Sequence, residues 1–286
     1  MNMISASISV KKSPGFWLAC GWLALLTLLS LGASWLPLEP PNGMNWERML
    51  ESPILFSFDG SSQSWLGTDG TGRDILSRLI FGARISLAVG ATSALVGLLL
   101  GGSLGVLAAY FRGGWGAAMV GSMDVILAFP GLVLLLGVSF HFGAGLTTLI
   151  PTLGILISPA FFRVARSATL KVIDREFVTS ARLMGQGNLS ILAGEILPNI
   201  AGPLMVYSVL MVAVLIVLEG AMSFLGLSVP PPQSSWGSMI AEGREVLSQA
   251  PHLCLIPVGA LFFTVLSLNV VGEGLRKKFA YNAGGS

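Results

Sequence analysis

The chain has 286 residues, of which 53% are hydrophobic and only 10% are charged, whereas soluble domains carry about 25% charged residues. The mean hydropathy of +0.79 also indicates an integral membrane protein. A net charge of +2 is too small to suggest a nucleic-acid partner. Two cysteines and two histidines are isolated in the sequence and form neither a disulfide framework nor a metal-binding spacing: Cys20, Cys254, His141 and His252.

Six apolar runs are long enough to cross a bilayer, because a hydrocarbon core of about 30 Å needs about 20 helical residues. In chain order they are 16–38, 85–111, 115–140, 146–164, 197–218 and 252–272. The first run is too long for a signal peptide and lacks a clear small-residue cleavage site. A lipid-exposed strand would leave backbone polar groups unpaired, so we expect an all-α fold with six transmembrane helices.

The distribution of Lys and Arg predicts that both termini are cytoplasmic. In this orientation the outside carries five of the sixteen, Arg48, Arg73, Arg78, Arg84 and Arg244, and the inside carries the other eleven. Residues 1–15 and 273–286 are then cytoplasmic tails, and 39–84 is an extracytoplasmic segment with a short helix. Residues 85–279 form the membrane core, with a cytoplasmic loop at 165–196 and an extracytoplasmic loop at 223–251.

Small residues recur at every fourth position of the second span: Ser93, Gly97, Gly101, Gly105 and Ala109. Such a stripe allows two helix backbones to approach closely, within this subunit or against another. We therefore predict that Gly97, Gly101 and Gly105 are helix-packing positions. The alternative is the general enrichment of glycine in membrane helices.

Two acidic residues fall near the ends of spans, Asp124 at the inner end and Glu219 at the outer end. An ionisable group in a span is a functional hypothesis by default. Because both lie close to an interface, capping or packing is an equally good interpretation.

A short amphipathic helix is predicted in the cytoplasmic loop, in the sequence REFVTSARLMG, residues 175–185. Asp174 can cap this helix, and Gly185 or Gly187 can end it. Its apolar stripe is Phe177, Ala181 and Met184 with Val178 beside them, and its polar face is Arg175, Thr179 and Arg182. A helix of about 11 residues is marginal alone. The membrane interface or a partner protein must therefore cover the stripe.

The loop resembles the EAA loop of ATP-binding-cassette (ABC) importer permeases. Ala181, Gly185, Leu197 and Pro198 stand in register with that motif, whereas Thr179 replaces its glutamate and Glu195 an isoleucine. In that family the short helix is a coupling helix, which docks on a cytoplasmic ATPase subunit. The resemblance implies that the ATPase-coupling residues are Arg175, Glu176, Phe177, Val178, Ala181, Arg182, Met184 and Gly185.

Three further stretches, 65–87, 219–240 and 268–279, look like the peptide/nickel branch of these permeases. Glu273 is a conservative change from the usual aspartate, whereas Lys277 departs from the pattern. The matches run in the expected order from about residue 65 to 279 and fit best the second-permease (C-type) subunit. They imply a type I ABC importer permease fold.

The segment at 65–79 lies outside the membrane in this topology, where Asp69 or Thr71 can cap a helix that begins near Arg73. It could form a gate that contacts a binding protein, or it could close the outer end of the bundle structurally. The later stretch VPPPQSSWG forms a stiff outer loop with Trp236 as an interfacial anchor. The candidate contact residues are Trp65, Asp69, Arg73, Asp74, Pro231 and Trp236.

No P-loop, nucleophile elbow or HExxH motif occurs in the sequence, so we expect neither an enzyme nor a bound cofactor or metal, with ATP and Mg²⁺ on partner chains. The resemblance implies a permease subunit that imports di- or oligopeptides across the inner membrane of a bacterium. Its implied partners are a sister permease in a heterodimer, two ABC ATPases, an extracytoplasmic solute-binding protein and membrane lipid.

Two alternatives remain open at this point. Nickel, a metal chelate or haem could be the cargo of the same machinery. An ion-coupled secondary transporter would instead require inverted repeats and ionisable residues at the midplane, and we find neither.

Overall fold

The computed structural model describes residues 14–54 and 64–283, and its regular structure is helical. The longer helices are α1 (Pro14–Gly32), α2 (Ile75–Gly97), α4 (Gly114–Ala128), α5 (Gly131–Phe142), α6 (Leu146–Val172), α9 (Leu197–Phe224) and α11 (His252–Ala283). The shorter ones are α3 (Ser103–Tyr110), α7 (Glu176–Leu183), α8 (Asn188–Ile191) and α10 (Trp236–Glu245). The expected all-α fold is confirmed. Most of the predicted tail at 1–15, part of the segment at 39–84 and the last three residues lie outside the described ranges.

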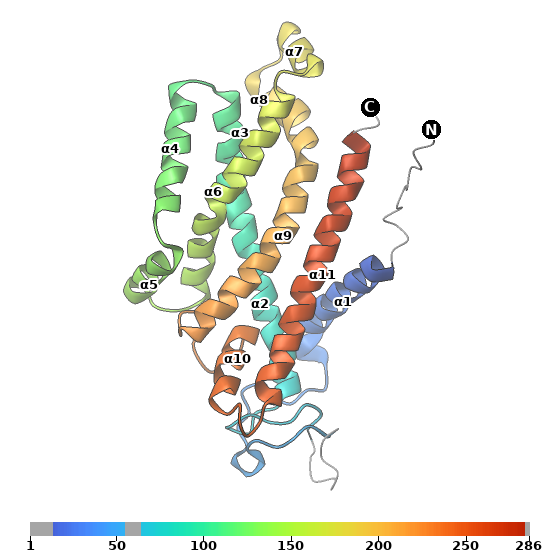
Figure 1. Ribbon diagram of the computed structural model, residues 1–286, viewed down its shortest axis with the longest axis vertical. Coiled ribbons are helices and arrows are strands. Elements are labelled where there is room, and N and C mark those ends of the chain that lie inside the picture. Colours follow the sequence, from blue (N-terminus) through green and yellow to red (C-terminus); the bar gives the residue numbers. More distant parts are fainter. Residues whose placement is uncertain (1–13, 55–63, 284–286) are drawn as a thin grey trace, which may run out of the picture.

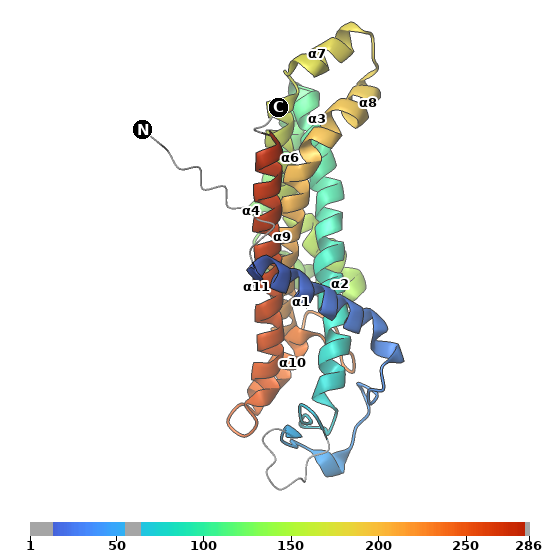
Figure 2. The ribbon, with the colours of Figure 1, turned by 90° about the vertical axis from the view of Figure 1, so that its right-hand side faces the viewer.

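The bundle is formed by α2, α6, α9 and α11, which run side by side (Figures 1 and 2). One end carries α7 and α8, and the opposite end carries α10 and the loops before α2. Figure 2 shows α1 lying obliquely across α11 and α2. The Trp22 indole donates a hydrogen bond of 3.1 Å to the Thr264 hydroxyl and fixes this crossing.

The second span begins earlier than the sequence suggested. The Asp74 carboxylate accepts a hydrogen bond from the Ser77 N–H at 2.7 Å and caps α2, which therefore starts at Ile75. From there the helix continues through a π-helical turn at Leu98–Gly102 into α3. The expected short outer helix is thus the first part of α2, and neither Asp69 nor Thr71 caps it.

The glycine stripe of α2 and α3 packs against α6 of the same subunit. A side chain at Gly101 would overlap the Ser158 carbonyl, and one at Gly105 would overlap the Phe162 carbonyl. At Gly97 the obstacle is the Ile157 side chain. These contacts place the close crossing inside the subunit.

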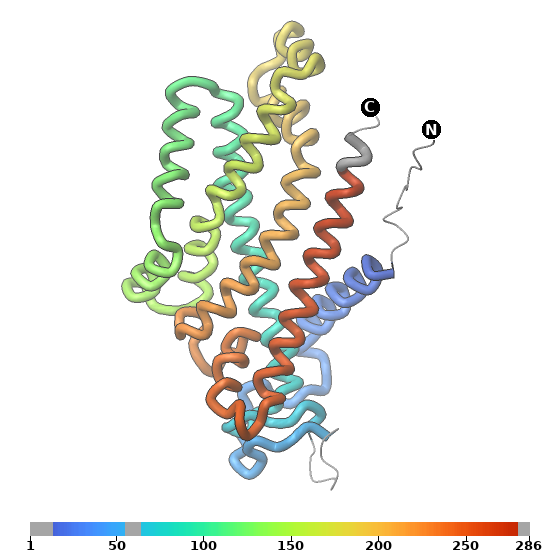
Figure 3. Tube along the Cα trace, in the orientation of Figure 1, coloured from blue at the N-terminus to red at the C-terminus, as the bar shows by residue number. Residues whose placement is uncertain are grey.

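The third span, expected as a single helix over 115–140, is broken. Helices α4 and α5 meet at an angle of 81°, an elbow that can be followed along the tube in Figure 3. Pro130 has no N–H to donate and pushes Phe129 into an extended conformation, which ends α4. The described residues thus contain five helices long and apolar enough to span a membrane, or six spans if the bent pair counts as one.

The remaining helices extend beyond the predicted spans at their α7 end. Helix α6 reaches Val172, and α8 continues through a π-helical turn at Leu192–Ile196 into α9. Helix α11 likewise continues past 272 to Ala283. The predicted loop at 165–196 is therefore reduced to residues 173–187, which we name the tip.

Candidate functional site

The tip begins with a turn into α7. Arg175 occupies the N-cap position, and its side chain makes no capping hydrogen bond. Asp174, the expected cap, instead forms an ion pair with Arg112 just after α3, at 2.8 Å. The helix is 8 residues long, shorter than expected.

Gly185, rather than Gly187, ends α7. Its φ angle is +78°, a left-handed conformation that glycine adopts without strain. The Gln186 N–H donates to the Ala181 carbonyl at 3.1 Å, and the Gly185 N–H donates to the Arg182 carbonyl at 3.0 Å. This pair of bonds is a Schellman motif, which satisfies carbonyls at the end of the helix.

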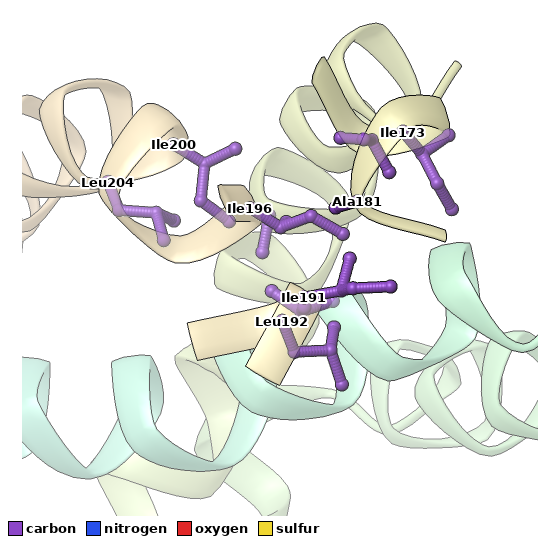
Figure 4. Packing of buried hydrophobic residues seen from close by; sticks show 10 residues of the cluster. Ile173, Ala181, Ile191, Leu192, Ile196, Ile200 and Leu204 are labelled. Atoms are coloured by element: carbon purple, nitrogen blue, oxygen red, sulfur yellow. The ribbon is translucent and has the colours of Figure 1, made fainter. Parts of the chain in front are cut away.

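Two side chains attach α7 to the bundle. Val178 and Ala181 are buried and pack with residues from the end of α6, from α8 and from the start of α9, namely Ile173, Ile191, Leu192, Ile196 and Ile200. Figure 4 shows this packing around Ala181. The inner face of α7 is therefore Val178 and Ala181, whereas Phe177 and Met184 of the predicted stripe are left for another surface to cover.

Large apolar side chains remain exposed around the tip. Phe177 is 39% exposed, Met184 73% and Leu183 84%, and Leu189 on α8 is 82% exposed. Leu183 and Leu189 are not among the residues predicted from the sequence. They could have been suspected from the length of the predicted helix, because so short a helix cannot bury apolar side chains on both of its faces.

The polar residues of the tip contact solvent or the end of α3. Arg175 and Glu176 are exposed. The Arg182 guanidinium lies over the Tyr110 ring, 5.4 Å from its centre, and the Tyr110 hydroxyl donates to the Asn188 side chain at 2.8 Å. Tyr110 therefore connects α3 to both sides of the tip.

The opposite end of the molecule consists of residues 64–78 and α10, and we name it the outer layer after the side on which the sequence predicts it. Four of its charged side chains form a compact group in which Asp69 pairs with Arg73 at 2.6 Å and with Arg78 at 2.8 Å. Glu242 of α10 pairs with the same two arginines at 2.8 and 3.0 Å. Two positive and two negative charges balance, and Arg78 is only 1% exposed.

The pKa values of the Asp69 and Asp74 carboxyls are shifted in opposite directions. Burial alone raises the pKa of Asp69, but hydrogen bonds from Thr71 and Arg73 and the Arg73 charge outweigh it and hold this pKa below its ordinary value. Burial raises the pKa of Asp74, and the Ser77 N–H opposes it only in part. Asp69 is therefore stabilised as a carboxylate, whereas Asp74 retains a cost of desolvation.

The structure separates the candidate outer contact residues into two groups. Asp69, Arg73 and Asp74 are buried in the outer layer. Trp236 is fully buried too, with its indole N–H donating to the Leu79 carbonyl at 3.0 Å, so its expected role as an interfacial anchor is wrong. Trp65 and Pro231 are exposed.

Glu219 supports the outer end from within the bundle. Its carboxylate is fully buried and accepts hydrogen bonds from the hydroxyls of Ser86, Ser223 and Ser228, at 3.1, 3.0 and 2.7 Å. It thereby joins α2, α9 and the loop before α10. Asp124 is exposed and pairs with Arg163 at 3.3 Å.

These features define the class of protein as a multi-pass helical membrane protein that presents an exposed amphipathic helix at one end. The spans are closely packed at the end that carries the outer layer. The amphipathic helix α7 projects from the opposite end. Within residues 14–54 and 64–283 no cluster of three or more metal-binding side chains occurs.

Comparisons with known proteins place the chain more narrowly. The family described as "Binding-protein-dependent transport system inner membrane component" matches residues 101–280. The "Glutathione transport system permease protein GsiD" of Pectobacterium atrosepticum is 37% identical over 89% of this chain and 83% of its own length. The same-named protein of Escherichia coli O157:H7 is 36% identical, over 89% and 82%.

Solved structures agree on the fold. An inward-facing structure of the MetNI methionine ABC transporter matches with a TM-score of 0.59 at 18% identity, covering 70% of this chain and 95% of that one. The chain belongs to the binding-protein-dependent transport family. It is the multi-pass inner-membrane permease subunit of a bacterial ABC importer, which works with ATPase subunits and a solute-binding protein.

Proposed function

We propose that this chain is one of two different permease subunits in an importer of short peptides, and that its tip transmits the motion of the ATPases. In this arrangement the tip and both termini are cytoplasmic, and the outer layer faces the solute-binding protein. ATP and Mg²⁺ bind to the partner ATPases, and this chain itself holds no cofactor or metal.

The coupling role is supported by how the tip packs against the spans and by the apolar side chains that it leaves exposed. Val178 and Ala181 pack against the end of α6 and the start of α9, so a displacement of α7 moves both spans. Phe177, Leu183 and Met184 remain uncovered beside the charged Arg175 and Glu176. A groove on an ATPase could cover these apolar groups, and a rigid-body motion there would tilt the spans.

The outer end supports the same mechanism. Its buried charges and the hydroxyl contacts of Glu219 hold α2, α9 and α10 together. Such an end can move as one body when the opposite end is displaced. Trp65 and Pro231 are the exposed candidates for contact with the binding protein.

The peptide cargo is supported by the sequence stretches of the peptide branch and by relatives named for the transport of glutathione, which is itself a small tripeptide. Vesicles that contain the complete complex should accumulate labelled di- or tripeptides when ATP and the binding protein are present. Uptake of nickel or haem without uptake of any peptide would reject the peptide cargo and leave the importer class intact.

The coupling role is tested with Phe177→Asp. A charge in the groove of the ATPase would remain unpaired, so we expect uptake to fall about tenfold or more, which corresponds to about 1.4 kcal/mol. Membrane insertion should be unchanged, because Phe177 is already partly exposed. Uptake and co-purification of the ATPases are measured together.

Thr179→Asp is the matched control, because it places the same charge on the same helix about 200° away. Thr179 is exposed, and we expect a much smaller loss of uptake. Equal losses in the two variants, or wild-type uptake in Phe177→Asp, would contradict docking through this face.

A further inference from the structure

A pocket of about 480 Å³ lies between α4 and α6, apart from the tip and the outer layer. Residues of α6 that recur at helical spacing line one wall of the pocket: Arg163, Arg166, Ser167, Leu170 and Lys171. From Arg163 to Lys171 they cover about 12 Å along the helix, and Lys171 is one residue from its end. The pocket therefore opens near the level where the spans leave the bilayer.

The pocket has an excess of positive charge. It contains three cationic side chains and a single carboxylate, Asp124, which pairs with Arg163. Within the described part of the chain, Arg166 and Lys171 form no ion pair. The Nε of Arg166 is buried and has no hydrogen-bond partner there, so an acceptor oxygen placed in the pocket would satisfy it.

The lining of the pocket also includes apolar side chains. Val120 and Met123 of α4 and Phe162 and Leu170 of α6 lie beside the charged side chains. A small inorganic anion would use only the cations. A lipid with a phosphate head and an acyl chain would contact the cations with its head and the apolar side chains with its chain.

We propose that this pocket binds the headgroup of an anionic phospholipid. Arg166 and Lys171 contact the phosphate, and the acyl chain runs beside Val120 and Met123. In the orientation proposed above, the pocket lies in the cytoplasmic leaflet, where basic pockets between spans are suited to anionic headgroups. The site does not depend on which solute is transported.

The test is native mass spectrometry of the purified full-length chain, titrated with phosphatidylglycerol or with phosphatidylethanolamine. Wild-type protein is expected to bind phosphatidylglycerol about tenfold more tightly. The double variant Arg166→Gln, Lys171→Gln should lose this preference. The control Arg276→Gln, Lys277→Gln removes two cations from α11 and should keep it.

Two additional measurements separate the possible failures. Arg166→Lys keeps the charge and should retain at least part of the preference, which shows that loss in the double variant is not misfolding. Glycerol phosphate carries the same charged group without acyl chains and should not displace the lipid. Equal affinity for the two lipids in wild-type protein, an unchanged preference in the double variant, or displacement by glycerol phosphate would overturn the proposal.

Discussion

The two ends of the molecule are constructed in opposite ways. In the outer layer, charged groups are buried and paired with one another, and Trp236 is fully enclosed. At the tip, an 8-residue helix buries two side chains and leaves Leu183 and Met184 exposed. The outer end thus satisfies its own polar groups, whereas the tip leaves apolar surface for another chain to cover.

This difference predicts where stability and function reside. Substitutions in the outer layer should lower the stability of the whole bundle, because its buried groups connect α2, α9 and α10. Substitutions at the tip should leave the bundle folded and impair transport, because only two side chains of α7 are buried, and segments with few buried contacts can unfold without the rest of the protein.

The largest effect is expected for Arg78→Met. In this variant Asp69 and Glu242 each lose one of the two cations with which they pair. Breaking a buried ion pair from one side costs about 3–5 kcal/mol, and we expect a loss near the lower end of this range, because both carboxylates still pair with Arg73. Thermal unfolding of the purified protein should show this loss, and insertion into membranes should fall.

Arg276→Met is the control, because Arg276 pairs with Glu273 at the surface. Exposed pairs contribute about 0–1 kcal/mol. If the two variants unfolded at the same temperature, the outer charges would not hold the bundle together, and the contrast between the two ends would fail.

A smaller effect is expected for Asp69→Asn. The amide can still accept hydrogen bonds from Thr71 and Arg73, but the charge opposite Arg73 and Arg78 is lost. Hydrogen bonds to charged groups contribute about 1.5–3 kcal/mol, and we expect a loss in this range. Asp74→Asn should change stability by about 0.5 kcal/mol or less, because asparagine caps helices as well as aspartate does.

The pH dependence sharpens this prediction. Asp69 has a depressed pKa in the folded protein. The ionised carboxylate therefore adds to the free energy of unfolding above its ordinary pKa of about 3.9, and this stabilisation is lost as the pH falls below that value. The difference in unfolding free energy between wild type and Asp69→Asn should therefore shrink on acidification. A constant difference from pH 7 to pH 3 would show that the charge of Asp69 contributes nothing.

Local patterns in the sequence were sufficient to predict that apolar spans and the tip exist, but not where the second span begins or that the third span is broken. Long apolar runs and the glycine spacing depend only on neighbouring residues, so Gly101 could be assigned to a close crossing before its partner, Ser158, was known. The tip could be recognised from its helical period and from Gly185. The angle at Pro130 could not be derived, because it depends on how α5 packs against α6.

The arrangement of the outer layer could not be predicted, because its contacts join residues far apart in the chain. Arg73 and Glu242 are separated by 169 positions, and Trp236 reaches a carbonyl 157 positions away. No local period encodes such pairs. For that reason side chains that appeared suited to contacting a partner proved to be buried, and the three serines around Glu219 were missed.

The smallest change in overall stability is expected at the tip itself, in Gly185→Ala. A Cβ would meet no atom within 4 Å, so the cost comes only from the positive φ angle. That conformation costs an L-residue roughly 1–2 kcal/mol. The Schellman turn should loosen, and transport should fall while the unfolding temperature of the bundle is unchanged. Uptake, thermal unfolding and hydrogen exchange at residues 181–187 are the measurements.

Gly194→Ala separates the backbone effect from the added methyl group. Gly194 also has open space around its Cβ position, but it lies in a helical turn without a positive φ angle, where alanine is favoured over glycine by about 1 kcal/mol. It should therefore leave uptake and hydrogen exchange at the tip unchanged. If Gly185→Ala lowered the unfolding temperature as much as Asp69→Asn does, the tip would be part of the cooperative core. The two ends would then share one stability, and a partner would not be needed to hold α7 in place.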